Sequence, residues 1–320
     1  MSIQVLRARE VPLGGPRALM VRRTLPHRDR SFIGAWCFVD HYGPTPVQPD
    51  TEMDLPPHPH TGLQTVSWLF EGEIEHRDSG GAHGPVRPGE VNLMTAGHGI
   101  AHSEVSTPGT TVLHGVQLWL ALPSPACDDA ARDFEHYAPQ PVEVAAERGH
   151  AQALVFLGSL AGVTSPVATY TPLLGAELTM SPGAVLGLDL DPDFEHGVLL
   201  DTGRLAVDGI PLEHGDLACQ DAGARQLRLQ AGVEGARVLL LGGAPFEEQI
   251  VMWWNFVGRS HEDIDKARQQ WQERSARFGE VEGYAGRLSW LPAPELPHLR
   301  LRPRGRMPVH GGDRGAAAAN

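Results

Sequence analysis

Two short segments of this 320-residue chain carry pairs of side chains that can bind a metal ion. The segment LPPHPHTGLQT contains His58 and His60, and a proline that restricts the backbone precedes each of them. The segment TAGHGIAHSE contains His102 and Glu104, again two positions apart. Residues i and i+2 of a strand point to the same face of a sheet. Each pair can therefore direct both of its side chains into the interior of a β-structure.

Two such strands lying side by side would bring three imidazoles and one carboxylate to a single point. Nitrogen and carboxylate oxygen suit borderline divalent ions such as iron, manganese, nickel, copper or zinc. Because no thiolate takes part and a six-coordinate ion would keep open positions, the donor set is typical of a catalytic site. A lone histidine more often has a surface or hydrogen-bonding role, and the chain has 16 histidines. Two pairs with the same step favour the metal site.

The elements that must position these side chains recur in two copies. SWLFEGEIEHRDSGG followed by GPVRPGEVNLMTAG has a parallel in GVLLDTGRLAVDG followed by IPLEHGDLACQDAG. The interval from Gly89 to Gly97 equals that from Gly215 to Gly223. Short alternating strands with Gly-rich turns predict a β-sandwich or small barrel, and two copies predict a tandem barrel. The 37 glycines and 27 prolines, spread along the chain, favour the same all-β class.

The second copy lacks the pairs of metal-binding side chains. The positions that correspond to the four candidate ligands are Asp189, Asp191, Arg228 and Gln230. None of these is a histidine, and a guanidinium group opposes a cation. We expect the second barrel to bind no metal and to serve structure or to close the cleft over the first.

Composition and pattern divide the chain into segments. We expect an N-terminal metal-binding barrel over residues 1–123 and a C-terminal barrel over 145–258. Residues 124–144, rich in Pro, Asp and Ala and without strand alternation, should be a linker. A helix should follow over 259–280, and an extension over 281–320 should be partly disordered. The basic residues of that extension, which could instead contact an anionic partner, include Arg300, Arg302, Arg304, Arg306 and Arg314.

The segment GRSHEDIDKARQQWQERSARF has the pattern of an amphipathic helix. Ser260 lies three residues before Asp263, which is the spacing of a capping box. One apolar stripe is formed by Ile264, Ala267, Trp271 and Phe278. We expect this helix to pack on the outside of a barrel.

Charge and cysteine content argue against several kinds of partner and compartment. The formal net charge of −13 repels phosphate, so direct binding of nucleic acid is not expected. No apolar run is long enough to predict a membrane span, and the first residues lack the apolar core of a signal peptide. Cys37, Cys127 and Cys219 lie far apart and form neither a disulfide framework nor a zinc ribbon. We expect a soluble cytoplasmic protein.

The motifs FVDHYGP, HPHTGLQTVSWLFEGEIEHRDSGG and AGHGIAHSE resemble those of the pirin family in the cupin superfamily. GGAPFEEQIVMWWNFVGRSHEDI resembles the C-terminal signature of the same family, so the match runs from Asp40 to about Phe278. The resemblance implies an all-β fold of tandem cupin barrels of the jelly-roll type with a short C-terminal helix. It implies one mononuclear iron, Fe(II), in the N-terminal barrel, with Mn, Ni, Cu, Zn or Co as alternatives. The family's metal ligands fall on His58, His60, His102 and Glu104.

Several nearby residues are candidates for supporting roles. Many relatives have glutamate where this chain has Gln64, which should leave the metal in place and alter the charge of the pocket. His98 could donate to the site or replace a ligand, or it could stabilise its own turn. His76 and Arg77 should lead towards solvent, and we assign them no function.

Two strands supply further candidates. Asp40 and His41 could orient a ligand imidazole, as carboxylates around metal sites often do, or could form a turn before the Gly-Pro step. His114 and Gln117 could line the cavity. We expect a small aromatic substrate and dioxygen as partners, with a protein partner as the alternative.

The resemblance implies quercetin 2,4-dioxygenase activity, in which the ring of a flavonol or a similar enolisable aromatic is cleaved. Glu104 is the expected catalytic base, because it is the carboxylate nearest the ion. One alternative is an iron-dependent redox sensor or protein-binding regulator of transcription. A second is another metal-dependent enzyme, such as an isomerase of a polar substrate, since a fold does not by itself define a reaction.

Overall fold

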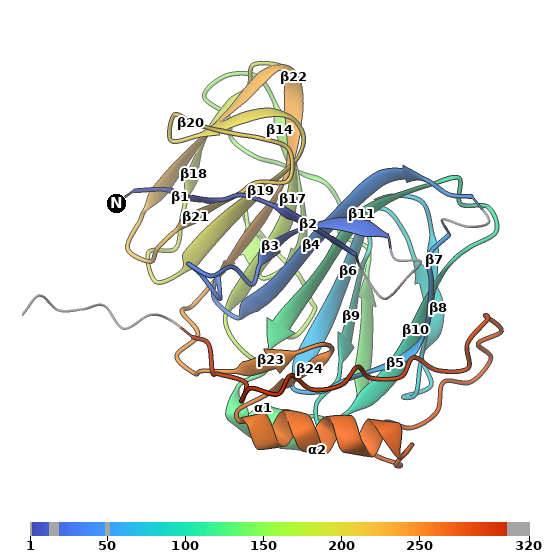
Figure 1. Ribbon diagram of the computed structural model, residues 1–320. Coiled ribbons are helices and arrows are strands. Elements are labelled where there is room, and N and C mark those ends of the chain that lie inside the picture. Colours follow the sequence, from blue (N-terminus) through green and yellow to red (C-terminus); the bar gives the residue numbers. More distant parts are fainter. Residues whose placement is uncertain (1, 13–18, 49–51, 306–320) are drawn as a thin grey trace, which may run out of the picture.

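The computed structural model describes residues 2–12, 19–48 and 52–305. Two β-barrels lie side by side, and a short helix crosses the end of the N-terminal one (Figure 1). The predicted all-β fold with tandem cupin barrels and a short C-terminal helix is confirmed. Within the described residues, no helix has the length and apolar character needed to cross a membrane.

The N-terminal barrel is built from two antiparallel sheets. The larger contains, in spatial order, β12 (Asp133–Tyr137), β9 (Val91–Thr95), β6 (Leu63–Glu71), β11 (Val112–Ala121), β4 (Trp36–Pro46), β3 (Met20–Leu25) and β2 (Arg9–Pro12). The smaller contains, in spatial order, β5 (Asp54–His60), β10 (Ile100–Ser106), β7 (Ile74–Asp78) and β8 (His83–Val86). The smaller sheet carries both predicted metal-binding pairs.

The C-terminal barrel is formed by one larger sheet with two side branches. Its main path contains β1 (Gln4–Leu6), β21 (Leu217–Gln220), β19 (Glu195–Val207), β22 (Gln226–Gly243), β17 (Leu173–Met180), β14 (Ala151–Leu157) and β13 (Val142–Glu143). The branches are β18 (Val185–Asp189) on β22 and β20 (Ile210–Leu212) on β19. Two small hairpins are β15 (Ser159–Leu160) with β16 (Val163–Thr164), and β23 (Val251–Trp253) with β24 (Phe256–Gly258).

The segment expected to be a linker without strand alternation, residues 124–144, contains regular secondary structure. It contains helix α1 (Ser124–Asp129) and strands β12 and β13. Strand β12 pairs with β9 of the N-terminal barrel, and Phe134 and Tyr137 pack on the core. The segment DFEHY is short and rich in charge, so its pairing depends on the open edge that β9 offers rather than on its own pattern.

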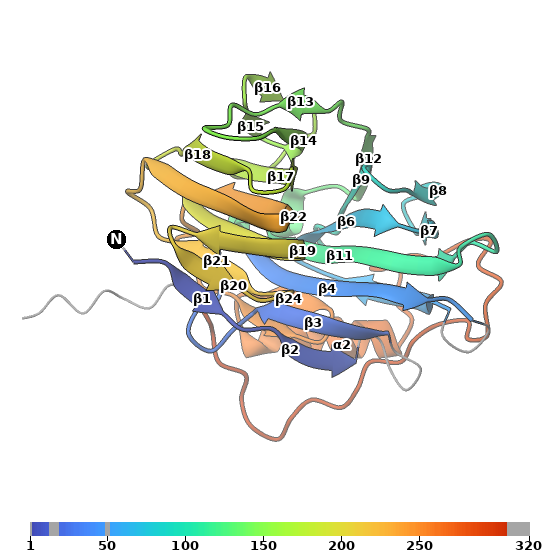
Figure 2. The ribbon, with the colours of Figure 1, turned by 90° about the horizontal axis from the view of Figure 1, so that it is seen from above.

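The two barrels exchange segments and share a core. Strand β1, from the start of the chain, pairs with β21 of the C-terminal barrel, and both views show it lying on that side (Figure 2). One continuous apolar cluster includes residues of both barrels. The indole of Trp36 donates to the carbonyl of Gly242 at 3.1 Å, and that of Trp68 donates to Glu177 at 2.8 Å. The barrels therefore form one packed body.

The C-terminal helix α2 (His261–Gln272) begins as predicted and ends earlier than the expected 259–280. Ser260 and Asp263 form the reciprocal capping box. Ile264, Ala267 and Trp271 are buried against the hairpin β23–β24. Arg274 adopts a left-handed conformation with φ of 52°, which ends the helix. Phe278 is still buried, but it lies beyond the helix.

The chain after α2 packs along the N-terminal barrel as far as it is described (Figure 1). Trp290 contacts Trp271 with ring centroids 5.5 Å apart, and Ile250 pairs with Arg304. Residues 306–320, with Arg306 and Arg314, lie outside the described residues, so the partial disorder expected within 281–320 stays a prediction there. The hairpin β23–β24 also packs on the N-terminal barrel, through the bridge of Thr61 with Phe256. The predicted C-terminal barrel over 145–258 therefore extends too far.

Candidate metal centre

The two predicted pairs lie on neighbouring strands. Strands β5 and β10 are antiparallel, and His102 lies opposite His58 in the register. A β-bulge falls between His102 and Glu104. The prolines before the two histidines of β5 remove backbone donors, which an edge strand of a sheet tolerates. The spacing of two residues thus directs these side chains to one face of the sheet, and the extra residue at the register shift belongs to β5, between Leu55 and His58.

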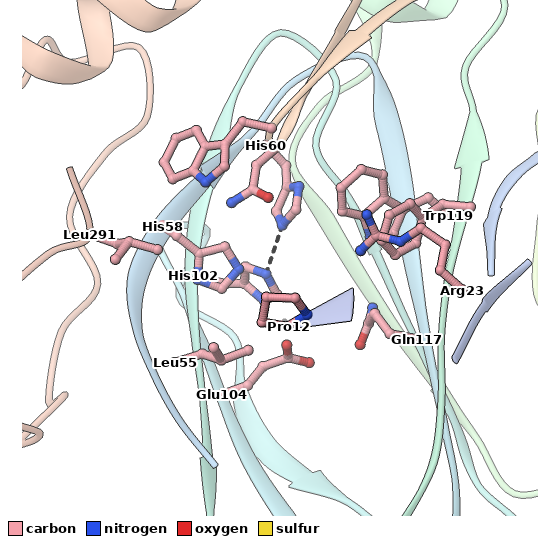
Figure 3. Close-up of a pocket in the computed structure, with 13 residues that line it drawn as sticks. Pro12, Arg23, Leu55, His58, His60, His102, Glu104, Gln117, Trp119 and Leu291 are labelled. Carbon is pink, nitrogen blue, oxygen red and sulfur yellow. Dashed lines mark hydrogen bonds between the residues drawn. The ribbon is translucent and has the colours of Figure 1, made fainter. Parts of the chain in front are cut away.

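Three imidazoles converge at the base of a pocket. One ring nitrogen from each of His58, His60 and His102 lies within 4.8 Å of the other two. The Nε2 atoms of His60 and His102 are only 3.0 Å apart (Figure 3). All three side chains are buried, with exposed fractions of 6% or less. Their arrangement is that of ligands facing a common centre.

Glu104 lies at the edge of this group. Its carboxylate clusters within 4.8 Å of His76 and His102, and the group formed by the three convergent imidazoles does not include it among the described residues. The hydroxyl of Ser67 lies 3.2 Å from the Glu104 carboxylate and 3.1 Å from the Gln117 carbonyl oxygen. Figure 3 shows the carboxylate on the side of the pocket opposite His60. Along β10 the pairing with β7 is regular from His102 to Glu104, so Glu104 lies two residues further along the strand, opposite His76.

Burial disfavours charge on every one of these groups. Burial lowers the pKa of His58 to about 4. Burial and the neighbouring imidazoles lower the pKa of His60 and His102 well below the ordinary value. Burial raises the pKa of Glu104, and the hydrogen bond from Ser67 offsets part of that effect. The imidazoles are therefore neutral near pH 7, which is the form that binds a metal ion.

The residues present fit a metal ion. The Nδ1 atom of His58 lies 2.9 Å from the carbonyl oxygen of Pro56, so it carries the proton and leaves Nε2 as a lone pair. The Nε2 atoms of His60 and His102 lie 3.0 Å apart, and among the described hydrogen bonds neither of these atoms has another partner. Neutral nitrogen donors crowded in this way gain from a cation between them.

Aromatic side chains wall the pocket, which encloses about 110 Å³. The rings of Phe38 and Trp119 stack with centroids 4.0 Å apart, and Trp119 meets His60 edge-on at 5.3 Å. The Arg23 guanidinium lies 4.3 Å from the Phe38 ring centroid. The remaining lining residues are Pro12, Leu55, Gln117, Trp254, Asn255 and Leu291. Such a wall accepts a flat, apolar body.

The C-terminal part of the chain, rather than the C-terminal barrel, completes this wall. Trp254 and Asn255 form the tip of the hairpin β23–β24. Trp254 has φ of 51°, a conformation that is rare for a bulky residue and is often retained at functional sites. The backbone N–H of Leu291 donates to the carbonyl of Pro57 at 2.8 Å, beside His58. Our sequence reasoning missed these residues, and the aromatic WWN segment was the available signal.

Two predicted supporting residues lie elsewhere than expected. His41 and His114 point away from the pocket and meet Asp201 of the C-terminal barrel at 2.7 and 2.6 Å. The prediction that His41 orients a ligand imidazole is therefore wrong, as is the prediction that His114 lines the cavity. Alternation along β4 and β11 sends these side chains to the interface between the barrels. Gln117 does line the cavity.

Asp40 acts on the pocket through another residue. Its two carboxylate oxygens accept from the Arg23 guanidinium at 2.7 Å each, so it positions Arg23 and not an imidazole. Gln64 donates to Thr95 at 2.9 Å and is not among the residues that line the pocket, contrary to the expected change in pocket charge. His98 is exposed and does not line the pocket, and its Nδ1 lies 3.6 Å from an oxygen of Asp128. Of the roles considered for it, stabilisation of its own turn is the one that remains.

His76, to which we assigned no function, belongs to this site. It is buried, with 3% of its surface exposed, and its ring lies beside that of His102. The expectation that it leads towards solvent is wrong because β7 pairs with β10 inside the smaller sheet. The i, i+2 spacing of Ile74, His76 and Asp78 in the sequence was the signal that could have revealed it, because it places His76 on the face of the buried Ile74.

Family models and relatives match the chain over most of its length. The model described as Pirin matches residues 18–120, and the Pirin C-terminal cupin domain matches residues 175–279. A Pseudomonas aeruginosa protein with the provisional name quercetin 2,3-dioxygenase is 46% identical over 91% of this chain and 91% of that protein. A pirin-like protein of Caulobacter vibrioides is 33% identical over 91% of this chain and 99% of that protein.

A solved structure has the same architecture. The crystal structure of a quercetin 2,3-dioxygenase from Acinetobacter baumannii matches with a TM-score of 0.86 and 40% sequence identity. The match covers 93% of this chain and 97% of that one. The arrangement of the two barrels is therefore shared with that protein.

Proposed function

Since this chain belongs to the pirin family of the cupin superfamily, we propose that it is a metal-dependent dioxygenase. Its substrate class is a flavonol or a similar enolisable aromatic compound, whose ring it opens. The observation that carries the proposal is the convergence of three buried imidazoles at the base of an aromatic-walled pocket. The relatives with quercetin 2,3-dioxygenase in their names support the same reaction.

The metal is held by the nitrogen-rich cluster of the smaller sheet. Ring nitrogens of His58, His60 and His102 would hold the ion, and the carboxylate of Glu104, which accepts from Ser67, would be the fourth ligand. Iron(II) is the ion we propose, with manganese, nickel, copper, zinc or cobalt as alternatives. When bound, a divalent ion supplies Lewis acidity that lowers the pKa of a substrate hydroxyl at an open position.

Glu104 takes the hydroxyl proton of the substrate. Burial raises the pKa of this carboxyl, so it holds a proton more strongly than an exposed glutamate does, as a general base requires. Ser67 lies between Glu104 and Gln117 and can share that proton. The catalytic role thus belongs to a group already within the pocket.

The walls orient the substrate and exclude water. The stacked pair Phe38–Trp119 presents a flat apolar surface, and Arg23 is fixed beside it by Asp40. The cavity of about 110 Å³ is smaller than the roughly 300–1,000 Å³ of typical ligand pockets. We therefore expect only the reacting ring of a flavonol to be enclosed, with the rest of the molecule towards the mouth.

The test is dioxygen uptake by the iron-loaded protein with quercetin, measured beside Glu104→Gln. We expect uptake by the wild type and its loss, by at least about 100-fold, in a variant that still holds iron, because removal of a general base costs roughly 10²–10⁴ in rate. Glu73→Gln, which changes a carboxylate on the outer surface, is the matched control and should keep full activity. Lack of uptake by wild-type protein with iron bound would refute the dioxygenase and favour an iron-dependent sensor or protein-binding regulator.

A further inference from the structure

Two buried side chains lie directly behind the ligand-candidate His102. Strand β7 pairs with β10 so that Asp78 lies opposite His102 and His76 lies opposite Glu104. All four side chains are buried, with exposed fractions of 4% or less. A buried carboxylate and imidazole are costly unless they hydrogen-bond, so their partners indicate what they do.

A continuous chain of hydrogen bonds leads from backbone to metal-binding face. One oxygen of Asp78 accepts from the backbone N–H groups of Gly80 and Ala82, at 2.8 and 3.0 Å. Its other oxygen lies 3.0 Å from Nε2 of His76. Nδ1 of His76 lies 3.4 Å from Nδ1 of His102. The ring of Phe134 stacks on His76 with centroids 4.6 Å apart, which fixes the plane of that imidazole.

The order of donors and acceptors along this chain follows from chemistry. An ionised carboxylate only accepts, so Nε2 of His76 carries a proton and donates it to Asp78. In a neutral imidazole the other nitrogen is then an acceptor, so Nδ1 of His76 accepts from Nδ1–H of His102. The Nε2 atom of His102 is left without a proton, and this is the atom that faces Nε2 of His60.

We propose that His76 and Asp78 are positioning residues that hold His102 in the tautomer whose Nε2 can bind the metal. This inference rests on the metal site of the proposed function. The carbonyl of Pro56 does the same for His58 by accepting from its Nδ1. His58 and His102 are thus held in the metal-binding tautomer in the metal-free protein, which lowers the free-energy cost of ordering the site when a metal binds.

Asp78→Asn tests the proposal with almost no change of shape. The two backbone N–H groups of Gly80 and Ala82 hold the side-chain carbonyl of the asparagine, which turns its NH₂ group towards His76. That group donates, so Nε2 of His76 must accept and its Nδ1 must carry the proton. The reversal passes along the chain and protonates Nε2 of His102, which blocks the ligand atom.

The first readout needs neither metal nor substrate. Long-range ¹H–¹⁵N correlation spectra of ¹⁵N-histidine-labelled, metal-free protein at neutral pH distinguish the two tautomers of each imidazole. We expect His102 to carry its proton on Nδ1 in the wild type and on Nε2 in Asp78→Asn. Wild-type His102 protonated on Nε2 would overturn the proposal, whether or not any variant folds.

The second readout is the affinity for cobalt(II), followed by its visible absorption in competition with a chelator. We expect roughly 10–100-fold weaker binding in Asp78→Asn and in His76→Phe, as is typical when groups that orient metal ligands are lost. His196→Phe, which removes a buried imidazole of the C-terminal barrel, is the matched control and should bind as the wild type does. Equal affinity in folded Asp78→Asn would refute the positioning role.

The outcomes separate this inference from the proposed function. If His76 were itself a ligand beside His102 and Glu104, His76→Phe would change the cobalt(II) spectrum while the tautomer of His102 in Asp78→Asn stayed as in the wild type. That pair of results would also overturn the inference. Absence of quercetin turnover, by contrast, would leave both readouts unaffected.

Discussion

At the scale of single residues, the neighbours of a histidine decide what it does. In the group of His58, His60 and His102, ring nitrogens lie close together, and the group as described contains no carboxylate. In the group of His41, His114 and Asp201, the carboxylate also pairs with Arg237 and the Arg22 guanidinium approaches His41. In this second group, Arg237 and Arg22 provide the positive charge that a metal ion would provide among His58, His60 and His102. The same residue types thus form the proposed metal site in one place and an ion-paired interface in the other.

Removal of a metal ion from the group of His58, His60 and His102 should lower the thermal stability of the protein. A ligand at about 100 times its Kd stabilises the folded state by about 2.7 kcal/mol, so we expect chelation to lower the Tm by about 5 °C. His60→Leu should show no such shift, because the site loses a ligand. Differential scanning calorimetry with and without iron(II) measures both values.

The second histidine group provides the control for this measurement. His114→Leu lowers the stability of the interface but should keep the full metal-dependent shift in Tm, since His114 faces Asp201 and not the pocket. A shift that persists in His60→Leu and disappears in His114→Leu would place the metal between the barrels and contradict our assignment.

At the scale of elements, the smaller sheet and the C-terminal hairpin together make the site. Strands β5, β10 and β7 bring the proposed ligands and the residues beside them into register. The hairpin β23–β24 adds Trp254 and Asn255, and helix α2 packs behind that hairpin. The helix therefore supports the pocket wall from behind, through the hairpin.

Loss of the helix cap should reduce stability and leave metal binding intact. In Ser260→Ala the side-chain acceptor for the backbone N–H of Asp263 is lost, and we expect about 1 kcal/mol less stability. Urea unfolding measures the change, and iron content per chain should stay as in the wild type. Asp265→Ala, at an exposed position of α2, is the matched control and should not be destabilising, because alanine favours helix. Equal destabilisation of both variants would contradict the capping role.

At the scale of the whole molecule, a buried polar cluster joins the two barrels. Asp201 from β19 contacts His41 from β4 and His114 from β11. Burial lowers the pKa of His41 to about 4, partly offset by its hydrogen bond to Asp201. Burial would raise the pKa of Asp201, but hydrogen bonds from both histidines and the charge of Arg237 hold it well below its usual range. A neutral His41 and an ionised Asp201 therefore accompany the folded state.

This cluster makes stability depend on pH in the acid range. His41 has an ordinary pKa of 6.5 and a folded pKa of about 4, so the unfolded chain binds its proton first as pH falls. The contribution of His41 to the free energy of unfolding is fully present above pH 6.5 and is lost progressively down to about pH 4. It amounts to about 3 kcal/mol. Asp201, with a lowered pKa, adds a further loss at more acid pH.

Urea unfolding between pH 7 and pH 4 checks the sign and the source of this effect. Wild-type stability should fall as pH decreases, and the slope in His41→Gln should be smaller by roughly one proton. The other histidines with lowered pKa values supply the slope that remains: His58, His60, His102, His196 and His214. A slope unchanged in His41→Gln would show that this imidazole does not couple stability to pH.

Local pattern was sufficient for the parts of this protein that depend on short-range geometry. The i, i+2 spacing of His58 with His60 predicts a shared face on any strand, and Ser260 with Asp263 predicts the start of a helix wherever that helix packs. The repeat of Gly-bounded strands predicts two barrels in the same way. The resemblance to pirins rests on these same motifs.

Only the tertiary structure decided which distant segments complete the pocket and which face each histidine takes. His41 and His114 turned to Asp201, more than 80 residues away in sequence, and His76 joined His102 through strand pairing. Trp254 and Leu291 reached the pocket from the far end of the chain. No local pattern carries this information, because contacts between remote segments depend on which barrel face is left open after each sheet has formed.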